Sequence, residues 1–105
     1  MPEFVRVAAL TELPPGSLKG ARIGDRAVCL ANVDGTVYAF QDNCTHKDFP
    51  LHSGALEGTR LECAWHGAQF DLAQGGRAVR LPAVKPIRMH DVRIEGDDIL
   101  VALKW

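Results

Sequence analysis

The sequence contains no long hydrophobic run and no block of charge of one sign. Twelve basic residues are scattered among thirteen acidic ones, which gives a net charge of −1 at neutral pH. No stripe of Lys and Arg could attract a phosphate backbone, so we expect no binding to nucleic acid. No window approaches about 18 consecutive apolar residues, and residues 1–10 lack a basic segment followed by an apolar run. We expect a soluble cytoplasmic protein without a membrane segment.

A convincing amphipathic helical period is also missing, and Pro14-Pro15-Gly16 ends the only early candidate. The 105 residues are 47% hydrophobic and 24% charged, which is typical of a globular domain rather than a disordered chain. The chain is too short to hold the substrate domain of an enzyme as well. We therefore expect one all-β domain over residues 1–105.

Two hairpins are predicted. In the first, residues 27–40, two β-rich runs flank Asp34-Gly35, a pair that tolerates the positive φ angles of a type I′ turn. In the second, the runs 87–95 and 99–103 flank Gly96-Asp97-Asp98. Between the hairpins lies a loop-rich insertion, broken by glycines and prolines, with short strands at 59–62 and 68–70.

The number of cysteines is odd. Cys29, Cys44 and Cys63 cannot all pair with one another, and a reducing cytosol disfavours disulfides in any case. At least one thiol is therefore free or bound to a metal. Cys29 lies between Val28 and Leu30 in a β-rich run, so we expect it to be a small apolar core side chain.

Two segments of the insertion each supply one thiolate and one imidazole. They are Cys44-Thr45-His46 and Cys63-Ala64-Trp65-His66, and sixteen residues separate His46 from Cys63. Two loops of this kind can face each other and present four donors around one point. Two sulfur and two nitrogen donors also suit a tetrahedral zinc ion, so the donor types alone leave the metal open.

The order and spacing of these donors are more specific. The pattern Cys-x-His followed by Cys-x-x-His-Gly, with Phe70 close behind, resembles the Rieske [2Fe–2S] motif. The resemblance implies a Rieske-type antiparallel β-sandwich with a cluster-binding subdomain inserted at about residues 42–83. It also implies one [2Fe–2S] cluster per chain, with Leu81-Pro82-Ala83 as the proline loop that covers it. By the same resemblance, Cys44 and Cys63 would bind one iron, and His46 and His66 the other.

The whole sequence is similar to the ferredoxin components of bacterial aromatic-ring dioxygenase systems. That similarity implies a monomeric one-electron carrier between an NAD(P)H-dependent flavoprotein reductase and a terminal oxygenase, and not an enzyme. An oxygenase would need a second iron site, for which only His52 and His90 remain. We expect both of these histidines to be ordinary, non-ligand residues. The alternative is a Rieske-like small subunit of a larger oxidoreductase such as a nitrite reductase.

The ligand set and its neighbours predict a low potential within the Rieske range. With two thiolates and neutral imidazoles the oxidised cluster is uncharged, which raises its potential above that of all-cysteine ferredoxins. High-potential Rieske proteins carry a serine and a tyrosine after the second histidine, where this chain has Ala68 and Phe70. The hydroxyls that would donate hydrogen bonds to sulfur are therefore absent. We expect both redox partners to dock on the patch formed by His46, Lys47, Phe49, Pro50, Trp65 and His66.

Overall fold

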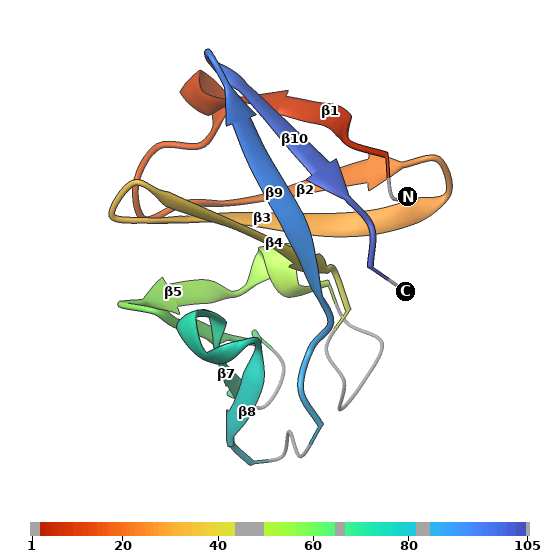
Figure 1. Ribbon diagram of the computed structural model, residues 1–105. Coiled ribbons are helices and arrows are strands. Elements are labelled where there is room, and N and C mark those ends of the chain that lie inside the picture. The colour runs from red at the N-terminus through yellow and green to blue at the C-terminus, as the bar shows by residue number, and fades with distance from the viewer. Residues whose placement is uncertain (1–2, 44–49, 65–66, 82–84, 105) are drawn as a thin grey trace.

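The computed structural model describes residues 3–43, 50–64, 67–81 and 85–104, in which the regular elements are β-strands and short 3-10 helices. Six strands form one antiparallel sheet, in the order β1-β10-β9-β4-β3-β2, and four form a second, in the order β5-β6-β7-β8. Figure 1 shows the larger sheet folded over on itself, with the smaller sheet packed at one end. The predicted all-β, antiparallel fold class is confirmed.

The larger sheet contains β1 (Val5–Ala9), β2 (Leu18–Ile23), β3 (Arg26–Val33), β4 (Thr36–Gln41), β9 (Met89–Glu95) and β10 (Asp98–Ala102). The smaller sheet contains β5 (Ala55–Glu57), β6 (Arg60–Glu62), β7 (Gln69–Asp71) and β8 (Arg77–Arg80). The 3-10 helices are η1 (Leu10–Glu12), η2 (Leu51–Ser53) and η3 (Leu72–Gln74). None of the helices in the described ranges is long and apolar enough to cross a membrane.

Both predicted hairpins are present. In the β3–β4 hairpin, Asp34 and Gly35 have φ angles of 51° and 94°, as the type I′ turn requires. In the β9–β10 hairpin the strands already pair at Glu95 and Asp98, so the turn is the two residues Gly96-Asp97 rather than the three predicted. Gly96 has a φ of 61°, a backbone conformation that glycine adopts without steric cost.

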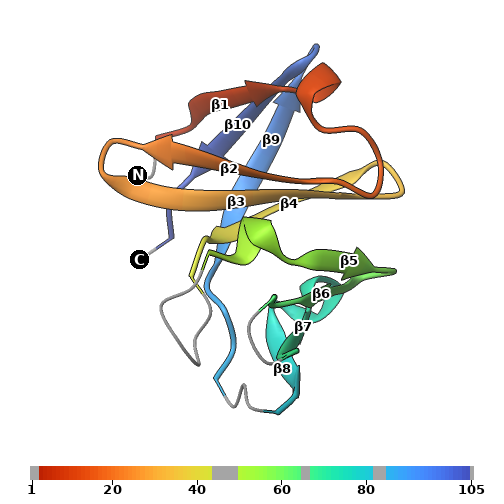
Figure 2. The same ribbon diagram turned by 180° about the vertical axis from the view of Figure 1, so that it is seen from behind.

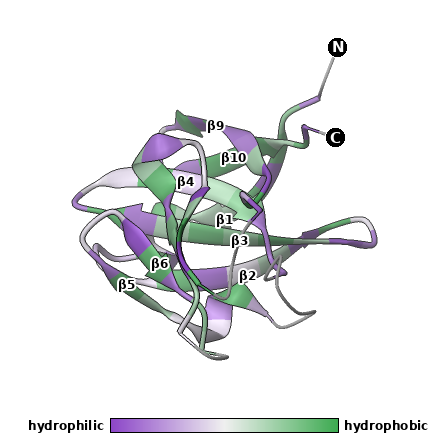
Figure 3. Cartoon of the chain, turned by 90° about the horizontal axis from the view of Figure 1, so that it is seen from below, coloured by the Kyte–Doolittle hydropathy of each residue, from purple (hydrophilic) through white to green (hydrophobic). Residues whose placement is uncertain are grey.

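Strand β3 is buried on both of its faces. Val28 and Leu30 point into a core inside the folded larger sheet, which they share with residues of β1, β4 and β10. Cys29 and Ala31 point the opposite way, into a second core shared with the smaller sheet. Figure 3 shows that β3 is coloured hydrophobic over much of its length. This strand is therefore the wall between the two cores.

The second core holds the smaller sheet against the larger one. Its buried residues are Cys29, Ala31, Phe40, Leu51, Leu61, Cys63, Ala68, Phe70, Leu72 and Ile87. Helix η2 lies between the two sheets and contacts β2 and β3, as the view from behind shows (Figure 2). Leu51 follows the first ligand segment, and Cys63 begins the second. Because both belong to this core, the two ligand segments are anchored in the same packed region.

Candidate metal centre

The described part of the second ligand segment begins with a deeply buried thiol. Cys63 directly follows β6 and is 1% exposed, and its backbone N–H donates to the carbonyl oxygen of Ala68 at 2.7 Å. Ala68 and Phe70 are fully buried beside it in the same core. The Cys63 side chain thus lies in an apolar, water-poor environment. The other three predicted ligands, Cys44, His46 and His66, lie outside the described residues, as do Lys47, Phe49 and Trp65.

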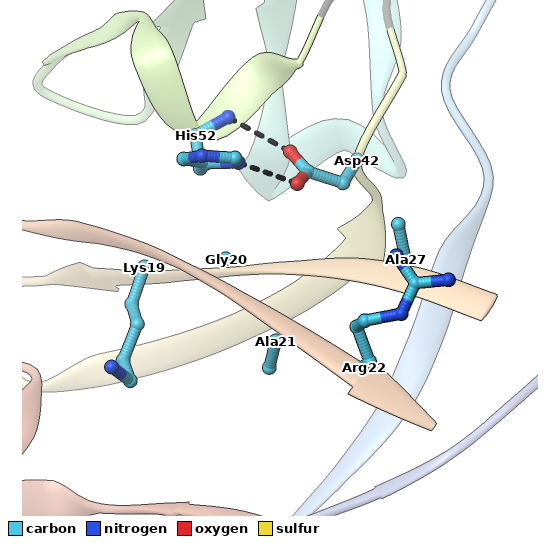
Figure 4. Close-up of a pocket in the computed structure, with 7 residues that line it drawn as sticks. All are labelled: Lys19, Gly20, Ala21, Arg22, Ala27, Asp42 and His52. Atoms are coloured by element: carbon cyan, nitrogen blue, oxygen red, sulfur yellow. Dashed lines mark hydrogen bonds and ion pairs between the residues drawn. The ribbon is translucent and has the colours of Figure 1, made fainter. Parts of the chain in front are cut away.

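The base of the first ligand segment is closed by Asp42. Its carbonyl oxygen accepts the backbone N–H of Leu51 at 3.3 Å, and its carboxylate Oδ1 accepts the backbone N–H of His52 at 2.9 Å. Its Oδ2 lies 2.5 Å from Nδ1 of the His52 ring. An ionised carboxylate only accepts hydrogen bonds, so Nδ1 carries the donated hydrogen. The residues before and after segment 43–50 are therefore held together (Figure 4).

Gln41 makes a second connection at the same place. Its side-chain Nε2 donates to the carbonyl oxygen of Asn43 at 2.9 Å, and its Oε1 accepts the backbone N–H of Arg88 at 2.7 Å. Its own backbone N–H donates to the carbonyl oxygen of Arg88 at 2.9 Å. Strand β4 is thereby joined both to the residue just before Cys44 and to the segment that leads into β9.

These contacts were not foreseen from the sequence. That His52 is an ordinary, non-ligand loop histidine stays a prediction, because Cys44, His46 and His66 lie outside the described residues. His52 does have a defined carboxylate partner, Asp42. Asp42 and Gln41 were not singled out. The separation of ten positions between Asp42 and His52 matches no short-range motif. Only the position of Asp42 just before a ligand segment could have drawn attention to it.

The surroundings of Cys63 fit a metal-bound thiolate. Burial in apolar surroundings disfavours an isolated thiolate, whereas a coordinated metal ion deprotonates a thiol outright. Within the described ranges no group of three or more His, Cys, Asp and Glu is arranged to hold a metal ion. The donor set predicted from the sequence combines Cys63 with residues outside those ranges, and its two sulfurs and two nitrogens suit a Rieske cluster.

Comparison with known families decides between the metals. The model of the Rieske [2Fe-2S] domain family matches residues 3–100. The chain belongs to this family. The predicted [2Fe–2S] cofactor of this Rieske protein is thereby confirmed, and the zinc alternative is set aside.

The relatives of this Rieske chain include ferredoxin components. It is 37% identical over 101 residues to the ferredoxin component of biphenyl 2,3-dioxygenase from Rhodococcus jostii, an alignment that covers 96% of this chain and 94% of that protein. A solved ferredoxin of carbazole 1,9a-dioxygenase from Nocardioides aromaticivorans has a TM-score of 0.89 and 34% identity, covering 96% of this chain and 98% of that one.

A further structure similar to the Rieske chain comes from a complex. It is a chain from the complex of reduced oxygenase and oxidised ferredoxin in carbazole 1,9a-dioxygenase, with a TM-score of 0.87 and 28% identity, covering 94% of this chain and 92% of that chain. One structural relative of similar length therefore comes from a complex with an oxygenase.

Cys29 is the other described cysteine. It is fully buried in β3, and its burial, followed by the nearby charge of Asp42, raises the pKa of the thiol well above its ordinary value. The thiol is therefore neutral under ordinary conditions. Its position in the core agrees with the predicted packing role.

Proposed function

We propose that this chain is a one-electron carrier between an NAD(P)H-dependent flavoprotein reductase and a terminal aromatic-ring dioxygenase. The observation that carries the proposal is the end-to-end match with ferredoxin components, which covers 96% of this chain and 94% of the biphenyl relative. The 105 residues form buried cores of their own, as a small carrier domain requires. The chain is proposed to act as a monomer and not as an enzyme.

The proposal treats residues 1–105 as a single domain, with the cluster-binding part at about 42–83. Cys44 and Cys63 are proposed to bind one iron, and His46 and His66 the other. When bound, the [2Fe–2S] cluster takes up and releases a single electron. The burial of Cys63, at 1% exposure, supports this assignment because it keeps water away from one thiolate ligand.

The residues around the site supply rigidity. Gln41 and Asp42 hold the two sides of the first ligand segment, and the N–H of Cys63 is bound to Ala68. Ligands held by a supporting layer of hydrogen bonds keep their geometry when the charge of the centre changes. Such preorganisation suits a carrier, which must be reduced and oxidised repeatedly.

Stopped-flow reconstitution tests the function. The purified protein is mixed with NADH and the flavoprotein reductase of a biphenyl dioxygenase system, and the reduced form is then mixed with the oxygenase component. We expect reduction by the first partner and reoxidation by the second, with a nitrogen-coordinated paramagnetic signal in the reduced state. Copurification with a large oxidoreductase, together with no transfer in either step, would instead support the alternative of a subunit such as that of a nitrite reductase.

A further inference from the structure

A glycine of the larger sheet lies directly against His52. A Cβ atom built at Gly20, in β2, would lie 2.8 Å from Nδ1 of the His52 ring and 3.1 Å from its Cγ and Cε1 atoms. Gly20 is not among the glycines with positive φ, so its backbone conformation is open to any residue. Glycine weakens a strand, and it commonly marks a point where another group approaches closely. The close approach here is that of the His52 ring.

The same ring nitrogen of His52, Nδ1, also contacts a buried carboxylate. Asp42 is 7% exposed and receives both the backbone N–H and the ring Nδ1–H of His52, at 2.9 and 2.5 Å. The two hydrogen bonds run to an ionised acceptor and are therefore stronger than neutral ones. Figure 4 shows His52 held above β2 with both contacts to Asp42, at the border of an open pocket of about 420 Å³.

Helix η2, which contains His52, also lies against the second ligand segment. A Cβ atom at Gly54, just after η2, would collide with the carbonyl oxygen of Glu62, the residue before Cys63. The next residue, Ala55, pairs with Glu62 in the sheet formed by β5 and β6. Backbone contacts therefore connect the end of η2 to Glu62, the residue before Cys63, with no flexible side chain between them.

We propose that His52 is a positioning residue for the cluster. Held between the carboxylate of Asp42 and the bare backbone of Gly20, it sets the place of η2. The position of η2 in turn sets the separation of the two ligand segments. The first segment begins two residues after Asp42, and the second begins directly after Glu62. This inference rests on the proposed ligand set.

A double-substitution cycle between Gly20 and His52 tests the contact. Gly20→Ala adds a methyl group against the ring, and His52→Ala removes the ring and its hydrogen bond. We expect each single variant to release its iron to a chelator about tenfold faster than the wild type, the factor that a loss of about 1.4 kcal/mol produces. Each should also shift the midpoint potential and the g values of the reduced cluster. In the double variant the alanine methyl meets no ring, so it should behave like His52→Ala alone.

Two further variants distinguish positioning from general stability. His52→Asn keeps an N–H donor near the place of Nδ1 and should restore most of the wild-type potential and iron retention. Ala21→Gly, at the adjacent position of β2, weakens the same strand, but the side chain points away from His52 (Figure 4). We expect it to lower the free energy of unfolding while leaving the potential and the paramagnetic spectrum unchanged.

Several results would overturn the proposal. One is an unchanged potential, spectrum and iron release in Gly20→Ala; another is strictly additive effects of Gly20→Ala and His52→Ala. A third is an Ala21→Gly variant that shifts the potential as much as Gly20→Ala does. Failure of the proposed carrier function has a different signature, because it would appear in the wild type as a lack of electron exchange with reductase and oxygenase.

Discussion

Ile87 donates its backbone N–H to the carbonyl oxygen of Gly76 at 3.0 Å, which closes the base of segment 77–86. A Cβ atom at Gly76 would lie 2.7 Å from Cγ1 and from the carbonyl oxygen of Ile87. Gly76 also has a φ of 80°, and it is buried. Gly76 belongs to the glycine-broken insertion, where glycines are typical of turns, and the structure adds a close packing contact to that role. The segment it closes includes Leu81-Pro82-Ala83, of which Pro82 and Ala83 lie outside the described ranges.

Gly76→Ala is therefore expected to be more destabilising than Gly75→Ala. Both glycines have positive φ, at 80° and 68°, so either alanine costs about 1–2 kcal/mol of backbone strain. Nothing lies within 4 Å of a Cβ atom at Gly75, whereas at Gly76 the methyl group also collides with Ile87. Urea unfolding of both variants measures the difference. Equal losses of unfolding free energy would show that Ile87 simply moves aside.

The ligand assignment predicts opposite outcomes at ligand and non-ligand positions. His46→Cys or His66→Cys should lower the potential or lose the cluster, because each replaces a neutral imidazole ligand by a charged thiolate. Cys29→Ser should retain the cluster, although it places a hydroxyl in a fully buried position and should cost about 1–3 kcal/mol of stability. Iron and sulfide analysis with the visible spectrum provides the measurement. Loss of the cluster in Cys29→Ser, combined with retention in Cys44→Ser, would refute the assignment.

The potential of the wild type should lie toward the ~−150 mV end of the Rieske range, because Ala68 and Phe70 bring no hydroxyl to the cluster. Ala68 is fully buried and accepts the N–H of Cys63 through its carbonyl oxygen. Ala68→Ser adds a hydroxyl next to this ligand and should raise the midpoint in protein-film voltammetry. A wild-type midpoint well above ~0 mV would contradict the low-potential hypothesis.

Docking of both redox partners is expected on the patch defined above, which includes His46 and Lys47. Small interfaces suit brief redox encounters, and charges at their rim mainly change association rates. Lys47→Glu should alter the electron-transfer rates and their salt dependence but leave the visible spectrum unchanged. Arg6→Glu, on β1 at the opposite end of the fold from the smaller sheet, serves as the matched charge reversal (Figure 1). Equal rate changes in the two variants would point to net charge rather than to a docking patch.

His90 should make folding stability depend on pH. It is 6% exposed, and burial, followed by the charge of Arg88, lowers the pKa of its imidazole. The unfolded chain therefore binds this proton more readily than the folded protein does. The neutral ring of His90 therefore contributes fully to the free energy of unfolding above the ordinary histidine pKa of about 6.5. This contribution declines as the pH falls below that value.

Urea unfolding at about pH 7.5 and about pH 5.5, for the wild type and for His90→Gln, isolates this effect. Glutamine keeps an acceptor that can replace Nδ1, which receives the backbone N–H of Lys104 at 3.2 Å. We expect the wild type to lose more stability on acidification than the variant does. The same loss in both proteins would assign the pH dependence to other groups.

The sequence by itself determined the features that depend on local chemistry. Asp34-Gly35 specifies its hairpin because these two residues tolerate positive φ, and the donor order from Cys44 to His66 identifies the family because the spacing is short-range. The strand boundaries were less accurate. Strand β9 begins at Met89 rather than at residue 87. The pairing of Met89 with Phe40 across the sheet sets this boundary.

Only the tertiary structure decided which residues support the site. Asp42 meets His52 across a ligand segment, and Gly20 meets the same ring from a distant strand. No local signal marks such pairs, because Gly20 has an ordinary φ and His52 lies in no motif. Contacts between remote segments arise only when the two sheets pack through a common core, and that packing depends on the whole chain at once.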